Sequence, residues 1–327
     1  MLRSIFAIIS KKINKPSISI YPTYSAPFHE QLYLDCFSSK DLITWEKHER
    51  IIDNTRIKWL NNALWAPAAL EKDGKYYLFT YVFFDKGCVS VADKPEGPFK
   101  VIGTYQYAPE DAGDNGVYND PGVLVDDDGR VYVYYGFEAS HMNELDPETM
   151  IRVLPGSLRH HVIDDREGVP EEQRFFEASS PRKIGDTYYL IYSPRKGSRL
   201  AYATSDKPTG PFTYRGYIVD NSSDYPGGND HGSIMKVGEE WYIFYHRMTN
   251  GTCFSRQACV ERIEILPDGS IPQVEMTSCG PNGGPLPGKG EYPAYIACHI
   301  FDDKRQMMID APGHAYVTQD GRDGDEE

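Results

Sequence analysis

Two carboxylic acids, Asp120 and Glu177, occupy matching places in two similar segments of this sequence. Asp120 lies nine residues before the glycine of a predicted turn, and Glu177 lies eight residues before the glycine of another. Glycoside hydrolysis requires such a pair, because one carboxylic acid protonates the leaving oxygen while a second carboxylate activates water or attacks the sugar. A neighbouring carboxylate also helps an acid to stay protonated near neutral pH. Each residue, taken alone, is compatible with an ordinary role in a turn or at the start of a strand. Their matched positions favour a shared chemical role.

An aromatic side chain and a histidine stand at the same place in two further segments. Trp65 precedes its turn glycine by nine residues, and His231 precedes its own by seven. If the four segments are arranged around one axis, these side chains and the two carboxylates face a common pocket. Trp65 would then either line a sugar subsite or pack in the core, and both interpretations are open at this point.

The four segments are copies of one repeat. Each has a Gly/Asp turn followed by β-branched and aromatic residues, which is typical of a hairpin entering a strand. Their turn glycines are separated by 55, 56 and 53 residues. The copies are KDGKYYLFTY (Lys72–Tyr81), DDGRVYVYYG (Asp127–Gly136), IGDTYYLIYS (Ile184–Ser193) and VGEEWYIFYH (Val237–His246).

A second element recurs between these copies, as a strand, a polar turn and an outer strand marked by proline or tryptophan. It occurs at Phe37–Trp45, Val89–Phe99 and Ala201–Phe212. Two hairpins in each repeat form a four-stranded antiparallel unit, which is a β-propeller blade. A β-sandwich would not produce so regular a spacing, and 23 prolines and 29 glycines disfavour helices. The sequence therefore predicts an all-β propeller whose innermost strands carry the four residues above.

The composition restricts the partners of the chain. Its net charge of −14 would repel a nucleic-acid backbone, and no apolar run approaches the roughly 18 residues that a membrane span needs. We therefore expect neither a nucleic acid nor a membrane as partner, whereas a neutral carbohydrate is compatible with this charge.

The apolar run at the start of the sequence is short and is followed by lysines instead of a cleavage site, which favours a cytoplasmic location over secretion. The six cysteines form no CxxC pair, which favours free thiols over disulfides or a zinc site.

Around these residues the sequence resembles glycoside hydrolase family 43, a family of five-bladed β-propeller glycosidases. The matching segments are LWAPAALEKDGKYYLF, NDPGVLVDDDGRVYVYYG, FFEASSPRKIGDTYYLIYS, LAYATSDKPTGPF and NDHGSIMKVGEEWYIFYHR. The resemblance implies an inverting enzyme of the α-L-arabinofuranosidase or β-xylosidase type, with arabinan, arabinoxylan or derived oligosaccharides as substrates. It implies Glu177 as the general acid, and Asp120 as the carboxylate that modulates the pKa of the acid and orients it.

The resemblance extends to two further residues. His231 is expected near the propeller axis, where some members hold a calcium ion or a water cluster. Because calcium prefers oxygen ligands, an ion beside His231 would be structural and mostly coordinated by water, and no cofactor is required for the reaction. Arg256, in CFSRQACVERI, resembles the family arginine that reaches the substrate from the last blade, although a surface strand arginine would look the same in sequence.

The sequence departs from the family at the start of the first blade. Family members carry their general base there, as the aspartate of an Asp-Pro unit, and the repeat places it near residues 8–13. Those residues read IISKKI, and the first 20 positions contain no Asp or Glu. We therefore expect an incomplete first blade, in which residues 1–17 replace the first strand, and hydrolysis slowed by about 10²–10⁴-fold without a positioned base. Neither Glu30 nor Asp35, which fall in or beside the next strand, is expected to substitute for it.

Two interpretations of function are open on this basis. One is a hydrolase impaired by the loss of its general base, and the other is a propeller that binds carbohydrate without turnover. A protein-interaction platform fits poorly with carboxylates gathered at the axis. The propeller is expected to span residues 18–300, and the acidic residues 301–327 are expected to form either a solvated tail or the start of a lost accessory module.

Overall fold

The computed structural model describes most of the predicted propeller. The described residues are 7–10, 17–20, 31–43, 45–57, 63–82, 87–113, 117–222, 229–248, 256–277 and 281. The predicted tail or accessory segment, 301–327, lies outside the described residues.

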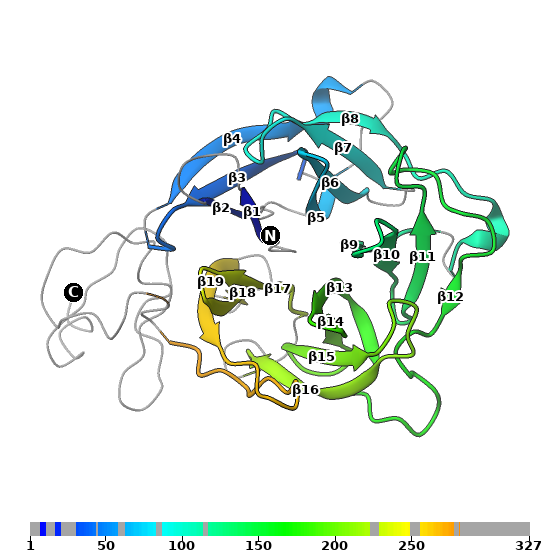
Figure 1. Ribbon diagram of the computed structural model, residues 1–327, viewed down its shortest axis with the longest axis vertical. Helices are drawn as coiled ribbons and strands as arrows, with labels where there is room; N and C mark the ends of the chain where they lie inside the picture. The colour runs from blue at the N-terminus through cyan, green and yellow to red at the C-terminus, as the bar shows by residue number, and fades with distance from the viewer. Residues whose placement is uncertain are drawn as a thin grey trace, which may run out of the picture.

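Over the described residues the strands form five antiparallel sheets, which are arranged as blades around a central axis (Figure 1). The first blade consists of β1 (Ala7–Ser10), β2 (Ser17–Ile20), β3 (Tyr33–Ser39) and β4 (Glu46–Asp53), and the second of β5 (Leu64–Lys72), β6 (Lys75–Val82), β7 (Cys88–Ala92) and β8 (Lys100–Gly103). The third consists of β9 (Gly122–Val125), β10 (Val131–Tyr135), β11 (His141–Leu145) and β12 (Arg159–His160), and the fourth of β13 (Phe175–Ile184), β14 (Thr187–Pro194), β15 (Arg199–Ser205) and β16 (Thr213–Asp220). The fifth consists of β17 (Gly232–Val237), β18 (Glu240–Met248) and β19 (Arg256–Ile263). Two short 3₁₀ helices follow β4 and β8 in the chain, η2 (Asn54–Arg56) and η3 (Pro109–Asp111). Among the described residues, no helix has the length and apolar character needed to cross a membrane. The predicted all-β propeller is confirmed.

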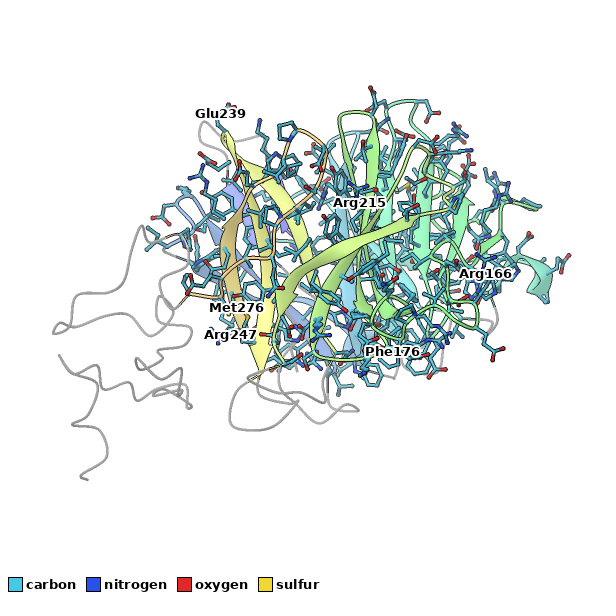
Figure 2. All side chains as sticks on the ribbon, turned by 90° about the horizontal axis from the view of Figure 1, so that it is seen from below. Arg166, Phe176, Arg215, Glu239, Arg247 and Met276 are labelled. Carbon is cyan, nitrogen blue, oxygen red and sulfur yellow. The ribbon has the colours of Figure 1, made fainter. Side chains whose placement is uncertain are left out.

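The innermost strands of neighbouring blades lie side by side and close a ring. β5 contacts β1 and β9, β13 contacts β9 and β17, and β17 contacts β1. The innermost strands begin on one face of the molecule and end on the other. Figure 2 shows this for Phe176, near the start of β13, and Glu239, in the turn after β17, which lie at opposite faces. Residues at the beginnings of these strands are therefore neighbours around the axis.

The hydrophobic core lies between the blades. Every residue of β10 is buried, because both faces of its blade are covered by neighbouring blades. Tyr135 packs in a cluster with Phe79 of the second blade, whereas Tyr134 packs in a cluster with Leu190 of the fourth. The tyrosines of the repeat thus serve to pack blade against blade.

The first blade differs from the expectation in one respect. It has four strands among the described residues, and part of the segment 1–17, Ala7–Ser10, supplies the innermost strand that this segment was expected to replace. The described residues of this blade thus show the same number of strands as those of the second, third and fourth blades. The blade with three described strands is the last, β17–β19. The physical reason is that strand pairing uses backbone groups, so the lack of an acidic side chain removes no hydrogen bond from the ladder.

Candidate active site

Three of the residues singled out in the sequence meet where the innermost strands begin. Asp120 lies two residues before β9, Glu177 is the third residue of β13, and His231 immediately precedes β17. They come from three successive blades, and Glu177 directly follows Phe176, which Figure 2 shows at one face of the molecule. The structure therefore brings together three residues that the repeat places at similar positions.

The two carboxylates are linked by one imidazole nitrogen. Nε2 of His231 lies 3.3 Å from Oε1 of Glu177 and 3.4 Å from Oδ2 of Asp120. All three side chains are buried. Burial strengthens the interactions within such a cluster, because little water screens the charges. The arrangement can hold a proton on one carboxyl group beside a second one, which is what general acid catalysis requires.

The backbone that presents these side chains has an unusual conformation in three blades, at Asp120 itself and at the residues that directly follow Trp65 and Glu177. The φ angle is 45° at Asp120, 45° at Ala66 and 71° at Ala178. Residues other than glycine adopt positive φ at a cost of about 1–2 kcal/mol, so the surrounding structure must hold them there. In β13 the register is irregular between Glu177 and Ser180. β-Bulges redirect side chains, and this irregularity begins at Glu177.

A second buried layer supports His231. The backbone N–H of Asp230 donates to Oγ of Ser193 at 3.2 Å, and Nδ2 of Asn221 donates to Oδ2 of Asp230 and to the carbonyl of His246, both at 2.8 Å. Nε2 of His246 lies 3.6 Å from Oδ1 of Asp230, and its ring stacks near that of His231, with centroids 6.3 Å apart. Burial lowers the pKa of His246 well below its ordinary value, so this ring is neutral near pH 7.

Arg256, the first residue of β19, belongs to the same layer. Its side chain is buried, and Nη2 donates to Oδ1 of Asn229 at 3.0 Å. Nδ2 of Asn229 lies 3.5 Å from Nε2 of His231. The positive charge of Arg256 adds to burial in lowering the pKa of His246. Arg256 is therefore not a surface arginine, and Asn229 connects it to the carboxylate cluster.

Five residues of this layer were not predicted from the sequence. Asn229 and Asp230 directly precede His231, and Ser193 and His246 each end a copy of the repeat, so their positions in the sequence are a signal that could have indicated them. Asn221 follows the outer strand β16 and has no such signal. Only its contacts with Asp230 and His246 reveal its place.

Comparison with known proteins shows the family of this chain. The model of the family described as glycosyl hydrolases family 43 matches residues 12–271. The chain belongs to this family. Family 43 enzymes hydrolyse O-glycosyl bonds, so the chain is a glycosidase by membership, as the resemblance predicted.

Curated relatives and solved structures agree with this assignment. The chain is 43% identical to a xylosidase/arabinosidase of Thermoclostridium stercorarium, over 89% of this chain and 70% of the relative. It is 35% identical to a β-xylosidase of Xylanibacter ruminicola, over 67% of this chain and 76% of the relative. A GH43_1 enzyme from Xanthomonas citri complexed with xylotriose has a similar structure, with a TM-score of 0.69 at 26% identity, covering 84% of this chain and 90% of that one. A family 43 arabinoxylan arabinofuranohydrolase from Bacillus subtilis, in complex with cellotetraose, gives 0.71 at 27%, covering 85% and 67%.

Trp65 stands near the start of β5 but is largely enclosed by protein. Its exposed fraction is 5%, and its ring contacts that of Tyr81 with centroids 5.9 Å apart and planes inclined at 60°. The same apolar cluster contains Val117, three residues before Asp120. The packing interpretation of Trp65 is thus favoured, at a place directly behind the segment that carries Asp120.

In the ring, β1 occupies the place that the repeat predicts for the family 43 general base. It lies between β17 and β5, and its sequence AIIS contains no carboxylate. Asp35 lies in β3, two strands further out, where Oδ1 accepts the backbone N–H of Arg50 at 2.7 Å and Oδ2 pairs with Nζ of Lys47 at 3.0 Å. These contacts hold Asp35 within its own blade. Glu30 lies outside the described residues.

The carboxylate cluster also bears on the expected calcium ion. Among the described residues, the group that could hold a metal is Asp120, Glu177 and His231, whose ligand atoms all lie within 4.8 Å of one another. Calcium takes six to eight oxygen ligands, whereas this set offers two carboxylates and a nitrogen that contacts both of them. The residues therefore do not fit a calcium ion held directly by protein ligands.

Proposed function

We propose that this family 43 glycosidase is an inverting enzyme of the α-L-arabinofuranosidase or β-xylosidase type. Its substrates are arabinose- or xylose-containing plant polysaccharides or the oligosaccharides derived from them. The observation that carries the proposal is the buried cluster of Glu177, Asp120 and His231 at one end of the ring of innermost strands. The names of the relatives, a xylosidase/arabinosidase and a β-xylosidase, support the class of sugar.

In this proposal Glu177 is the general acid. It protonates the leaving oxygen as the bond between that oxygen and the anomeric carbon breaks. Water adds to the opposite face of the sugar, releases its proton to solvent water and inverts the configuration. Asp120 favours the protonated form of the acid, because its negative charge opposes ionisation of a carboxyl group nearby. His231 and Arg256 bind the substrate, and Trp65 supports the sugar subsite from behind.

We further propose that hydrolysis is slow. Inversion needs a base that takes a proton from the attacking water, and β1, at the place of that base, has no carboxylate in its sequence. A positioned general base contributes about 10²–10⁴-fold to the rate. The acid and its modulator are retained, so residual turnover is expected to depend on them.

The substitution Glu177→Gln tests the acid. It keeps the size of the side chain and removes the transferable proton, so hydrolysis of alkyl xylosides or arabinofuranosides is expected to fall by about 10²-fold or more. The loss is expected to be smaller for 4-nitrophenyl glycosides, because nitrophenolate leaves without a proton. The rates are measured with both classes of leaving group, and sugar binding is measured by calorimetry.

Glu239→Gln serves as the control, since Glu239 lies on the opposite face of the molecule (Figure 2) and is exposed. It is expected to leave all rates unchanged. Full activity of Glu177→Gln, or an equal loss for both leaving groups, would contradict the assignment of Glu177 as the acid.

A second candidate function is a propeller that binds carbohydrate without turnover. The specific observation in its favour is the sequence of β1, which contains no carboxylate at the place expected for the base. Calorimetric binding of xylo- or arabino-oligosaccharides, with no product even at high protein concentration, would favour this candidate. Release of any monosaccharide that Glu177→Gln abolishes would exclude it.

We propose that no cofactor is required and that any calcium ion near His231 is structural and coordinated mostly by water. The donor set described above supports this, because it offers too few oxygens for a directly bound ion. Removal of calcium with EDTA is therefore expected to leave the hydrolysis rate unchanged within twofold, with Ca²⁺-saturated EDTA as control. Loss of activity that calcium restores would show that the ion takes part in the reaction.

A further inference from the structure

The connection between β10 and β11, residues 136–140, lies between the two segments that carry the carboxylates. The backbone N–H of Gly136 donates to the carbonyl of Asn119 at 3.0 Å, and Asn119 directly precedes Asp120. Two residues further on, the N–H of Glu138 donates to the carbonyl of Phe176 at 2.7 Å, and Phe176 directly precedes Glu177. Phe137, between these two anchors, is thereby fixed beside the site.

The connection is a rigid turn. Gly136 has a φ of 144°, and a Cβ atom at this position would lie 1.8 Å from the carbonyl oxygen of Ala139, so a side chain cannot be accommodated. Arg195 links the turn to the start of β13. Its guanidinium donates to the carbonyl of Glu138 in the turn and, at 3.3 Å, to the carbonyl of Phe175 in β13. The position of Phe137 is thus set by backbone contacts and does not depend on its own burial.

Phe137 presents an apolar ring to solvent at this place. Its exposed fraction is 40%, and Ile102 at 39% is the other exposed large hydrophobic residue among those described. The ring of Phe137 packs on that of Phe176, with centroids 5.0 Å apart and planes inclined at 55°. Ligand sites typically combine aromatic side chains with a few convergent polar groups, and the two rings and the carboxylate cluster are such a combination.

The chemistry of the site indicates which part of a substrate lies there. A general acid donates its proton to the leaving oxygen, so the leaving group must lie on the side of Glu177. The segment that carries Glu177 also carries Phe176, against which Phe137 packs. A pyranose ring offers a flat face of C–H groups, which an aromatic ring can cover while the sugar hydroxyls stay in water.

We propose that Phe137, backed by Phe176, forms the binding platform for the first pyranose ring of the leaving group. This inference rests on the proposed function, since it takes Glu177 as the acid. In this arrangement Phe137 favours substrates whose leaving group is an oligosaccharide or polysaccharide over substrates whose leaving group is a small alcohol.

The variants Phe137→Ala and Phe137→Leu test the platform. The test uses xylotriose against methyl β-D-xylopyranoside, and an arabinofuranosyl xylo-oligosaccharide against methyl α-L-arabinofuranoside. Both variants are expected to lower kcat/KM for the oligosaccharides about tenfold, which corresponds to losing part of the burial of one aromatic side chain. The methyl glycosides, whose leaving group is too small to reach the platform, are expected to change less than twofold. Phe137→Tyr keeps the ring and is expected to retain the oligosaccharide rate within twofold.

Ile102→Ala is the matched control, because it removes an apolar side chain of equal exposure from the outer strand β8. It is expected to change neither substrate class. The same oligosaccharides are titrated into the Glu177→Gln forms of the wild type and of Phe137→Ala, so the platform is measured by affinity even without turnover. Binding or hydrolysis that is unaffected in Phe137→Ala would overturn the platform and leave the proposed function standing. A wild-type chain that neither binds nor hydrolyses any of these sugars would overturn both.

Discussion

Glu261 in β19 is a buried carboxyl group outside the carboxylate cluster, and it couples the stability of the propeller to pH. Its Oε1 accepts the backbone N–H of Thr277 at 2.8 Å and the hydroxyl of the same residue at 3.0 Å. Burial nevertheless raises the pKa of Glu261 to about 7, from an ordinary value of 4.5. Because the folded state binds this proton more tightly than the unfolded state, the stabilisation is complete below pH 4.5 and is lost as pH rises to 7.

Replacement of Glu261 by glutamine is expected to abolish this dependence. The amide mimics the protonated acid at every pH, so the variant keeps the stability that the wild type loses as Glu261 ionises. The free energy of unfolding of the variant minus that of the wild type is expected to rise by about 3 kcal/mol between pH 4.5 and pH 8. Urea unfolding at the two pH values measures it, with Glu239→Gln as an exposed control. Parallel pH profiles of the wild type and of Glu261→Gln would contradict the raised pKa.

At the scale of elements, the spacing of the carboxylates depends on the close approach of β9 and β13. Gly122, the first residue of β9, lies against the carbonyl of Ser179 in β13, and a Cβ atom there would be 2.3 Å from that oxygen. Asp120 stands two residues before this contact, and Glu177 two residues before Ser179. The glycine therefore allows the two strands to bring their carboxylates to the same imidazole.

Gly122→Ala is expected to push the two strands apart. Overpacking of this kind typically destabilises by about 1–3 kcal/mol, and displacement of Asp120 from Glu177 is expected to lower kcat by more than the stability loss explains. Thermal unfolding and kcat with a methyl glycoside measure the two effects. Gly238→Asn is the control, since Gly238 lies in a turn with open space around it and asparagine tolerates its φ of +61°. Unchanged stability and kcat in Gly122→Ala would show that β9 and β13 can separate without effect.

At the scale of the whole molecule, ring closure is what makes a site from residues far apart in the chain. β1 completes the ring between β17 and β5, so the first and last blades meet beside His231. The same closure places the backbone of β1, where the repeat predicts the family's general base, among the innermost strands. The net charge of −14 suits a neutral sugar, which is not repelled by a carboxylate-rich site.

Much of this molecule could be predicted from its sequence, because a repeat places equivalent residues at equal distances from a common axis. The spacing of the turn glycines predicted the blades, and the matched positions of Asp120, Glu177 and His231 predicted the cluster. The number of strands in the first blade could not be predicted in this way. The acidic residue expected there is absent, yet the backbone of Ala7–Ser10 still pairs.

The carboxylate pair, the repeat and the absence of an acidic residue from the first 20 positions were thus determined by the sequence itself. Only the tertiary structure decided that one nitrogen of His231 joins the two carboxylates, that Asn229 connects Arg256 to them, and that the turn carrying Phe137 lies between them. The physical reason is that these contacts join segments from different blades and loops. Their geometry depends on how blade packs against blade, which no local pattern of residues encodes.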